Sequence, residues 1–275
     1  MRLSEGHVEG ERVVCPYHGF RYALDGQGES PATPTMSLCA TAYEAVERDG
    51  AIWVREQGAD TAFPVIGRQG YHLYGVLQHD IHAPLEPCLD NFSEVEHTPT
   101  THALFGYRAA AMARVETETQ LTEDTVRVIN RGPQKPVPAF VEKIFDVHSD
   151  DDFVDDWTVH FSPVHIRYHQ YWIDPVSDAR RPQQLHLAVF FTPIDPDTTR
   201  VVTFVHLTRD PRARFGFDWI VARPILMRLI DHEVKLDKRM IEQLADKSPD
   251  LRGTRLGRFD KALRENRKRI ERIYR

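Results

Sequence analysis

Apolar residues alternate with smaller or polar ones along much of the chain after residue 70, and this pattern predicts β-strands. In the clearest case Leu185, Leu187 and Val189 occupy alternate positions. Apolar residues also stand between them, so we expect the sheet to be covered by helices on one side and to wrap around a pocket. Strands are predicted for residues 71–83, 107–118, 125–130, 157–162, 165–173, 185–192 and 201–208.

Residues 217–244 show a helical period instead. One stripe of the predicted helix carries Ile230, Val234, Ile241 and Leu244. Asp237 falls inside that apolar stripe, where a lone carboxylate would lose several kcal/mol of hydration unless a cation or hydrogen bonds compensated. Asp237 is therefore expected either to bind a metal ion or to pair with an Arg or Lys from another element.

A shorter helix is predicted for residues 85–97, because apolar residues recur there at helical spacing and Pro84 and Pro87 suit only a first turn. Three polar side chains would project from one side of this helix: Asn91, Glu94 and His97.

Pro99 disfavours a helical Thr98, so the chain is expected to leave the helix there and to bring His102 back towards His97. Two neutral imidazoles at this spacing are either unrelated surface or capping residues or half of a metal site. With Asp237 as a third ligand they would form the one-sided His-His-carboxylate arrangement that non-haem Fe(II) uses.

Composition narrows the class of protein. The chain has 275 residues, enough for one large or two smaller domains, and 28% of them are charged, with a net charge of −6. This balance excludes a sequence-wide footprint for nucleic acid or anionic membrane. No apolar run approaches the roughly 20 residues of a membrane span, and no signal peptide is evident. A cytoplasmic location is expected.

Cysteine usage points to metal or thiol chemistry. Cys15, Cys39 and Cys88 are too scattered for a disulfide framework. Cys15 and His18, however, share one tight loop between two predicted strands, with Gly19 permitting the turn. Taken alone, this spacing is half a site that suits zinc as well as iron.

The run Leu3-Ser4-Glu5-Gly6, followed by Cys15-Pro16-Tyr17-His18-Gly19, resembles the second half of the Rieske [2Fe-2S] motif of ring-hydroxylating oxygenases. A Rieske cluster takes two Cys on one iron and two His on the other. The resemblance therefore implies that Cys15 and His18 would each ligate a different iron of a [2Fe-2S] cluster.

A second motif extends the resemblance over the chain: Asn91-x-x-Glu94-x-x-His97-x4-His102. In these oxygenases two histidines and a distant helical Asp bind mononuclear iron, which implies His97, His102 and Asp237 as ligands of Fe(II). Asn91 and Glu94 occupy the remaining motif positions. The acid is usually Asp; its implied role is to bridge a Rieske histidine to an iron-ligating histidine across a subunit boundary of a homotrimer.

The implied fold class is α+β: part of a Rieske all-β domain in residues 1–58, then a helix-grip (START-like) catalytic domain with a curved antiparallel sheet in residues 59–275. The implied function is that of the terminal oxygenase component, which uses O2 and electrons from a separate NAD(P)H-dependent reductase or ferredoxin to hydroxylate or demethylate a small organic substrate, as in aromatic hydrocarbon catabolism. A helix-grip ligand-binding protein without working iron remains the alternative.

The resemblance begins in mid-domain. The family supplies the other two cluster ligands from a Cys-x-His about sixteen or seventeen residues before the second Cys, but no Cys precedes Cys15. The chain is therefore expected to lack its beginning, through a start codon assigned too late or a real truncation, and to bind mononuclear iron without a Rieske cluster.

Two further expectations concern the pocket and the surface. Aromatic residues near the predicted strands are expected to line the pocket, and such a lining favours an aromatic or alicyclic substrate. The candidates are Phe140, Phe145, Trp172, Phe190 and Phe204, with His160, His165, His169, His186 or His206 as polar contacts or, more simply, as structural groups. Residues 146–156, which are acidic, and residues 264–275, which are basic, are expected to be solvated faces.

Overall fold

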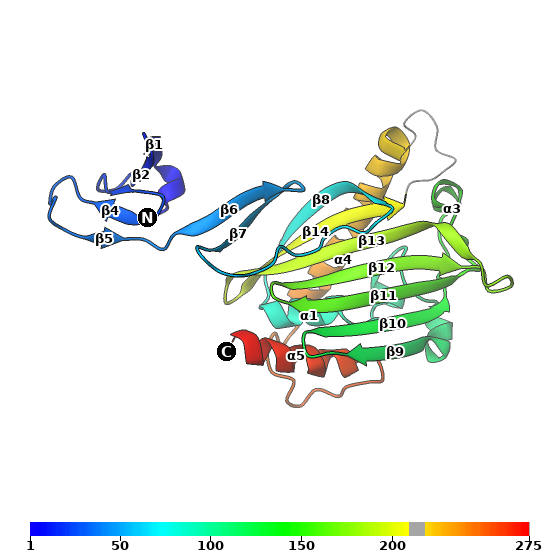
Figure 1. The fold of residues 1–275 in the computed structure, drawn as a ribbon. Coiled ribbons are helices and arrows are strands. Elements are labelled where there is room, and N and C mark those ends of the chain that lie inside the picture. The colour runs from blue at the N-terminus through cyan, green and yellow to red at the C-terminus, as the bar shows by residue number, and fades with distance from the viewer. Residues whose placement is uncertain (209–217, 275) are drawn as a thin grey trace. The chain divides into compact units, whose positions relative to one another are not determined.

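The computed structural model describes residues 1–208 and 218–274, without the side chains of residues 144, 145, 218 and 219. The chain forms two compact units, Met1–Phe63 and Pro64–Arg275. Their division lies five residues beyond the predicted domain boundary after residue 58, and the assignment of the two domains to functions stays a prediction. Figure 1 shows the elements of each unit.

The first unit consists of short strands. Five of them form an antiparallel sheet in the order of the chain, and two more form a separate hairpin whose turn, Asp49-Gly50, has positive φ at both residues, as a tight two-residue hairpin requires. A 3-10 turn, η1 (Leu3–Glu5), precedes them. The strands are β1 (His7–Glu9), β2 (Arg12–Val14), β3 (Arg21–Tyr22), β4 (Gln27–Glu29), β5 (Leu38–Cys39), β6 (Tyr43–Arg48) and β7 (Ala51–Glu56).

The second unit is built on a seven-stranded antiparallel sheet in the order β8-β14-β13-β12-β11-β10-β9. Its strands are β8 (Tyr71–Ile81), β9 (Glu116–Leu121), β10 (Thr125–Pro133), β11 (Asp152–Phe161), β12 (Val164–Ile173), β13 (Arg180–Asp195) and β14 (Thr198–Thr208). Six predicted strands are confirmed in position. The seventh, residues 107–118, is wrong over most of its length, because a 3-10 segment, η2 (Ala109–Arg114), precedes β9.

Helices cover one face of this sheet (Figure 1). α1 packs on β13, β14 and α4, and α4 also packs on β8, whereas α5 lies against β10 and β11. This is the predicted α+β architecture with a curved antiparallel sheet. The helical elements are α1 (Leu85–Phe92), α2 (Thr98–Thr101), α3 (Ala139–Phe145), the π-helical turn η3 (Asp218–Ala222), α4 (Arg223–Glu242) and α5 (Lys261–Tyr274).

The apolar stripe of α4 faces the sheet as expected over most of its length. Ile230, Val234 and Ile241 are buried, and Asp237 is buried among them with 6% of its surface exposed. Leu244 is the exception: it lies beyond the last helical residue and is 46% exposed, so its predicted place in the stripe is wrong. Phe217, the predicted first residue of this helix, lies outside the described residues.

Both predicted solvated faces are wrong in part. Asp151 and Asp155 of the acidic segment are buried, because strand β11 begins inside it and turns alternate side chains inward. The basic tail forms α5, whose Ile270 packs in the core and whose Arg267 makes an ion pair with Asp90 of α1. The apolar residues of this segment recur at helical spacing and form one buried face, which its high content of basic residues did not predict.

Candidate metal centre

The segment that carries the two histidines is more broken than its apolar spacing predicted. The first helix ends at Phe92 rather than continuing to His97, because the buried Ser93 turns its hydroxyl back to the carbonyl oxygen of Leu89, 2.6 Å away. The expectation that Pro99 keeps Thr98 out of a helix is also wrong. Pro99 lies in the first turn of α2, where its missing N–H costs no hydrogen bond.

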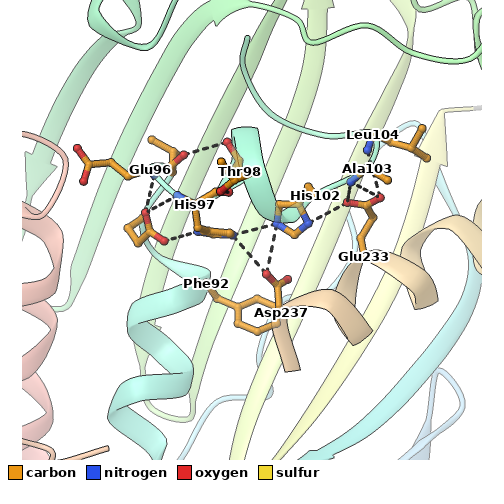
Figure 2. Close-up of polar contacts among 12 residues, drawn as sticks. Phe92, Glu96, His97, Thr98, His102, Ala103, Leu104, Glu233 and Asp237 are labelled. Carbon is orange, nitrogen blue, oxygen red and sulfur yellow. Dashed lines mark hydrogen bonds and ion pairs between the residues drawn. The ribbon is translucent and has the colours of Figure 1, made fainter. Parts of the chain in front are cut away.

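The two histidines and the helical Asp nevertheless meet (Figure 2). Nε2 of His97 lies 3.0 Å from Nε2 of His102. Oδ1 of Asp237 lies 3.3 Å from each of these nitrogens. Within the part of the chain that the structure describes, this is the cluster of three His, Cys, Asp or Glu side chains close enough to share one metal ion.

Carboxylates on the far sides of both rings set their orientation. Nδ1 of His97 is in close contact with Oε1 of Glu94, and Nδ1 of His102 lies 2.8 Å from Oε2 of Glu233, although not in line for a full hydrogen bond. Each carboxylate favours the ring proton on Nδ1, which leaves the lone pair of Nε2 pointing at the other two ligand atoms. This is how proteins orient metal-binding histidines.

Glu233 was missed by the sequence analysis. Besides approaching His102, it accepts backbone hydrogen bonds from Ala103 and Leu104, all at 3.2 Å, and so fixes the turn after the second histidine (Figure 2). It lies one helical turn before Asp237, and a second carboxylate at this i, i+4 spacing on a buried stripe was the available signal.

Lys135 was missed as well. Its ammonium group donates to the backbone oxygens of Thr98 and Pro99, both 3.3 Å away, and to that of His102. It therefore clamps the α2 turn between the two histidines. Burial lowers the pKa of Lys135. No sequence pattern singled it out, because its partners are carbonyl groups 33 to 37 residues away.

The electrostatics of the cluster favour a bound cation. Burial would lower the pKa of His97, but Asp237 and Glu94 together raise it to about 10. No donor of the described chain is aligned in a hydrogen bond with Oδ1 of Asp237, although this oxygen is buried. Two imidazole nitrogens and a carboxylate oxygen at 3.0–3.3 Å repel one another unless a positive charge lies among them, either a proton, as the raised pKa of His97 reflects, or a metal ion. The donor set fits a divalent metal held on one face.

The other two predicted site residues lie beside the cluster. Asn91, on the last turn of α1, lines the adjoining pocket, and its buried Oδ1 has no hydrogen-bond partner in the described chain. Glu94 has left the helix, and its Oε2 accepts the backbone N–H groups of Glu96 and His97 at 2.5 and 3.3 Å. The predicted projection of both from one helix is therefore wrong, although both reach the same site.

The cluster opens into a pocket with about 690 Å³ of empty space, counting its mouth. Its aromatic lining comes from Phe92, Phe105, Tyr107, Phe153 and Tyr168. None of the predicted aromatic residues lines it: Phe140 is 51% exposed, the side chain of Phe145 is outside the described residues, and the remaining three lie elsewhere. Trp172 lines a neighbouring apolar cavity, while Phe190 and Phe204 alternate to the opposite face of the sheet.

The second predicted ligand pair has a different setting. Cys15 and His18 lie on a tight loop between β2 and β3, closed by the backbone hydrogen bonds Cys15 N to Phe20 O at 2.7 Å and Gly19 N to Cys15 O at 3.0 Å. Cys15 is buried and His18 exposed. Among the residues that the structure describes, no third Cys, His or carboxylate joins them in a ligand cluster.

Comparisons with known proteins agree with the two-part architecture. Residues 81–275 match the family model of the vanillate O-demethylase oxygenase C-terminal domain, and residues 1–44 match that of the Rieske [2Fe-2S] domain. In the described chain, no helix has the length and apolar character needed to span a membrane.

Curated relatives match over part of their length. Chlorophyllide a oxygenase of Arabidopsis thaliana is 29% identical over 105 residues, which are 36% of this chain and 19% of the relative. The vanillate O-demethylase oxygenase subunit of a Pseudomonas species is 30% identical over 109 residues, which are 37% of this chain and 33% of the relative. These matches therefore span between a fifth and a third of the relatives.

Two solved structures share the fold. Dicamba monooxygenase bound to 3,6-dichlorosalicylic acid has a TM-score of 0.74 at 18% identity and covers 98% of this chain and 82% of its own. Pseudomonas putida NdmA with caffeine has a TM-score of 0.69 at 20% identity and covers 97% of this chain and 73% of its own.

Proposed function

The chain belongs to the family of the vanillate O-demethylase oxygenase C-terminal domain, and from this premise we propose that it is the terminal component of a Rieske-type oxygenase. In this proposal, His97, His102 and Asp237 hold one Fe(II). The observation that carries it is the convergence of their three ligand atoms within 3.0–3.3 Å. The reaction is hydroxylation or demethylation of a small organic substrate with O2.

The bound iron would supply a centre that binds and reduces O2 beside the substrate. The chain's own residues orient and seal that centre. Glu94 and Glu233 keep the protons of His97 and His102 on Nδ1, away from the metal side. Lys135 fixes the turn between the histidines, and Phe92, Phe105 and Phe153 keep bulk water from the pocket wall.

The electron supply is part of the same proposal. A separate NAD(P)H-dependent reductase or ferredoxin would deliver electrons to a [2Fe-2S] cluster, with Cys15 and His18 as two of its ligands, in a cytoplasmic homotrimer. Cys15 and His18 would be two of the four ligands that such a cluster takes. In this proposal, Glu94 bridges a histidine of the cluster to His97, and electrons pass through it to the iron.

Iron analysis tests the proposal. Protein loaded with Fe(II) without oxygen should hold one iron per chain, and replacing His97, His102 and Asp237 together with Ala should remove it while the second unit stays folded by circular dichroism. Asp231→Ala is the control, because Asp231 lies on α4 but bonds to His79 and Lys235 instead. Stoichiometric iron in the triple variant would refute the assignment.

A ligand-binding protein without oxygenase activity is the second candidate. It is favoured by one observation: Cys15 and His18 gather no further ligand among the described residues. Oxygen consumption separates the two candidates. Only the oxygenase should consume O2 when iron-loaded protein receives electrons and a substrate.

A further inference from the structure

A row of polar side chains crosses the inner face of the sheet beside the metal cluster. In the strand register, Asn130 of β10 is opposite Asp155 of β11, and Asp155 is opposite Gln170 of β12. All three side chains are buried. Hydrophobic neighbours lie on both sides of the row, since Phe153 and Trp157 precede and follow Asp155 on the same face. Asp155 and Gln170 both line the pocket.

Asp155 forms no ion pair in the described chain. Its neighbouring carboxylates do: Asp151 is paired with Arg181 at 2.6 Å and Asp156 with Arg127 at 2.7 Å. Asp155 is 6% exposed and accepts one hydrogen bond, from Nε2 of Gln170 at 2.9 Å. Burial raises the pKa of Asp155 to about 6, although the hydrogen bond from Gln170 and the nearby charges of His102 and His97 act to lower it. An unpaired carboxylate in a core is costly, which points to a function rather than to packing.

Other polar atoms around the same pocket also lack partners. Buried side-chain oxygens without a hydrogen bond in the described chain belong to Asn91, Tyr107, Gln170 and Thr203, and all four residues line the pocket. Most buried polar atoms in folded proteins are hydrogen-bonded. Several orphaned atoms that face one cavity are therefore explained by a ligand that bonds to them.

The charges of the lining select the ligand. No Lys or Arg is among the described residues that line the pocket, but four carboxylates are: Glu94, Asp155, Glu233 and Asp237. A divalent ion at the triad would leave this lining negative. An anionic ligand would be repelled and would find no guanidinium or ammonium to pair with. A basic group, or a neutral N–H or O–H donor, would be attracted to Asp155.

We propose that Asp155 determines specificity and that the substrate is a neutral or basic compound, with an N–H or O–H donor on an apolar, ring-sized body, rather than an aromatic carboxylate. Asp155 accepts the donor, Gln170 holds the Asp155 carboxylate in place, and Phe92, Phe105 and Phe153 enclose the apolar body. That this ligand is a substrate rests on the proposed oxygenase function; the selection of the ligand by Asp155 does not.

Calorimetric binding of three matched probes tests the inference: 4-methoxybenzylamine, 4-methoxybenzyl alcohol and 4-methoxybenzoate, which differ in charge on one scaffold. The amine should bind about tenfold or more tightly than the benzoate, because a charge-assisted hydrogen bond replaces a repulsion. The alcohol should lie between them. Benzoate binding as tight as that of the amine would overturn the proposal, and so would failure of all three probes to bind.

Two variants locate the effect. Asp155→Asn should remove the preference for the amine over the alcohol. Asp156→Asn is the matched control, because it removes a carboxylate from the next position of β11, on the opposite face and paired with Arg127, and the preference should persist. An unchanged preference in Asp155→Asn would contradict the inference.

The test of iron binding at the triad and the test of ligand preference at Asp155 can give negative results independently of each other. Binding of the probes to iron-free protein is measured without turnover. Iron at the triad with no amine preference would refute the role of Asp155 alone, whereas an amine preference in a chain that binds no iron would refute the oxygenase alone.

Discussion

The two candidate ligand clusters of this chain are built in opposite ways. His97 is held by Glu94 of its own segment and His102 by Glu233 and Lys135 from distant segments, and the ligand atoms of both rings converge with that of Asp237. Cys15 and His18 share one loop that is closed by local backbone hydrogen bonds. We expect ligands that are supported by other side chains to keep their geometry without a metal. A loop that is closed only by its own backbone hydrogen bonds positions two ligands but does not bring further ligands to them.

Burial differs in the same direction. In the described part of Met1–Phe63, the buried apolar side chains are Val14 and Cys15, whereas the second unit has two extended apolar clusters. Because apolar burial is the main favourable term in folding, the triad lies in a frame that resists distortion. We therefore expect the positions of the triad ligands, which lie in the unit with the large core, to be more rigid than those of Cys15 and His18.

The largest expected effect comes from the contact that holds α1. Arg267→Met should lower the free energy of unfolding of the second unit by about 3 kcal/mol, because it leaves the largely buried carboxylate of Asp90 without its partner. Chemical denaturation of the wild type and the variant measures this difference.

Two companions make the measurement specific. Arg264→Met, on the exposed side of α5, should change little. Asp90→Asn combined with Arg267→Met should recover most of the loss, since no buried charge is then left unpaired. A single variant as stable as the wild type would show that α5 does not hold the ligand-bearing segment.

A smaller effect is expected from Glu233. Glu233→Gln should weaken Fe(II) binding by roughly 10- to 100-fold, because an amide orients the Nδ1 proton of His102 less firmly than a carboxylate does. Competition with a colorimetric chelator measures the affinity. Glu242→Gln removes a carboxylate farther along α4 and should bind iron as the wild type does; equal affinities in all three proteins would contradict the role of Glu233.

The sequence sufficed for features set by short repeating patterns. Alternation located six of the seven strands, and the helical stripe placed Asp237 in the core. The family resemblance implied that Asp237 acts with His97 and His102, and the ligand atoms of the three residues lie close together. These predictions succeeded because local period and buried position are directly related.

Features that depend on long-range contacts could not be predicted from the sequence. The end of α1 depends on a buried hydroxyl of Ser93, which Asn266 of α5 also contacts at 3.0 Å. Lys135 acts through distant carbonyl groups, which have no sequence signature. The aromatic lining was misassigned because Phe190 and Phe204 alternate to the far face, and only the strand register decides which face is inside.

A pH-dependent effect of similar or smaller size is expected at Asp155. The pKa of Asp155 is about 6 in the folded protein, against about 4 in an unfolded chain. Its carboxyl group therefore destabilises the folded state increasingly as the pH rises from about 4 to 6, and by a constant amount at higher pH. Asp155→Asn should therefore be more stable than the wild type by about 2 to 3 kcal/mol near pH 8 and equally stable near pH 4. Thermal melts of the wild type, Asp155→Asn and the control Asp156→Asn between pH 4 and pH 8 measure this difference in stability. A stability difference between Asp155→Asn and the wild type that is the same at every pH would contradict the raised pKa.

The smallest expected effect separates the two clusters. Cys15→Ser should leave the iron content of the triad unchanged, because Cys15 belongs to the other compact unit and is not among the residues of the described triad cluster. Loss of triad iron in this variant would mean that the clusters are not independent.

The position of the iron tests the central claim most directly. Crystals of the protein soaked anaerobically with Fe(II) should give one strong anomalous difference peak at the iron absorption edge, between Nε2 of His97, Nε2 of His102 and Oδ1 of Asp237. Bond lengths of about 2.1 Å are expected, as for the imidazole and carboxylate ligands of similar divalent metals. No peak at this position, or a peak at Cys15 and His18 instead, would contradict the assignment.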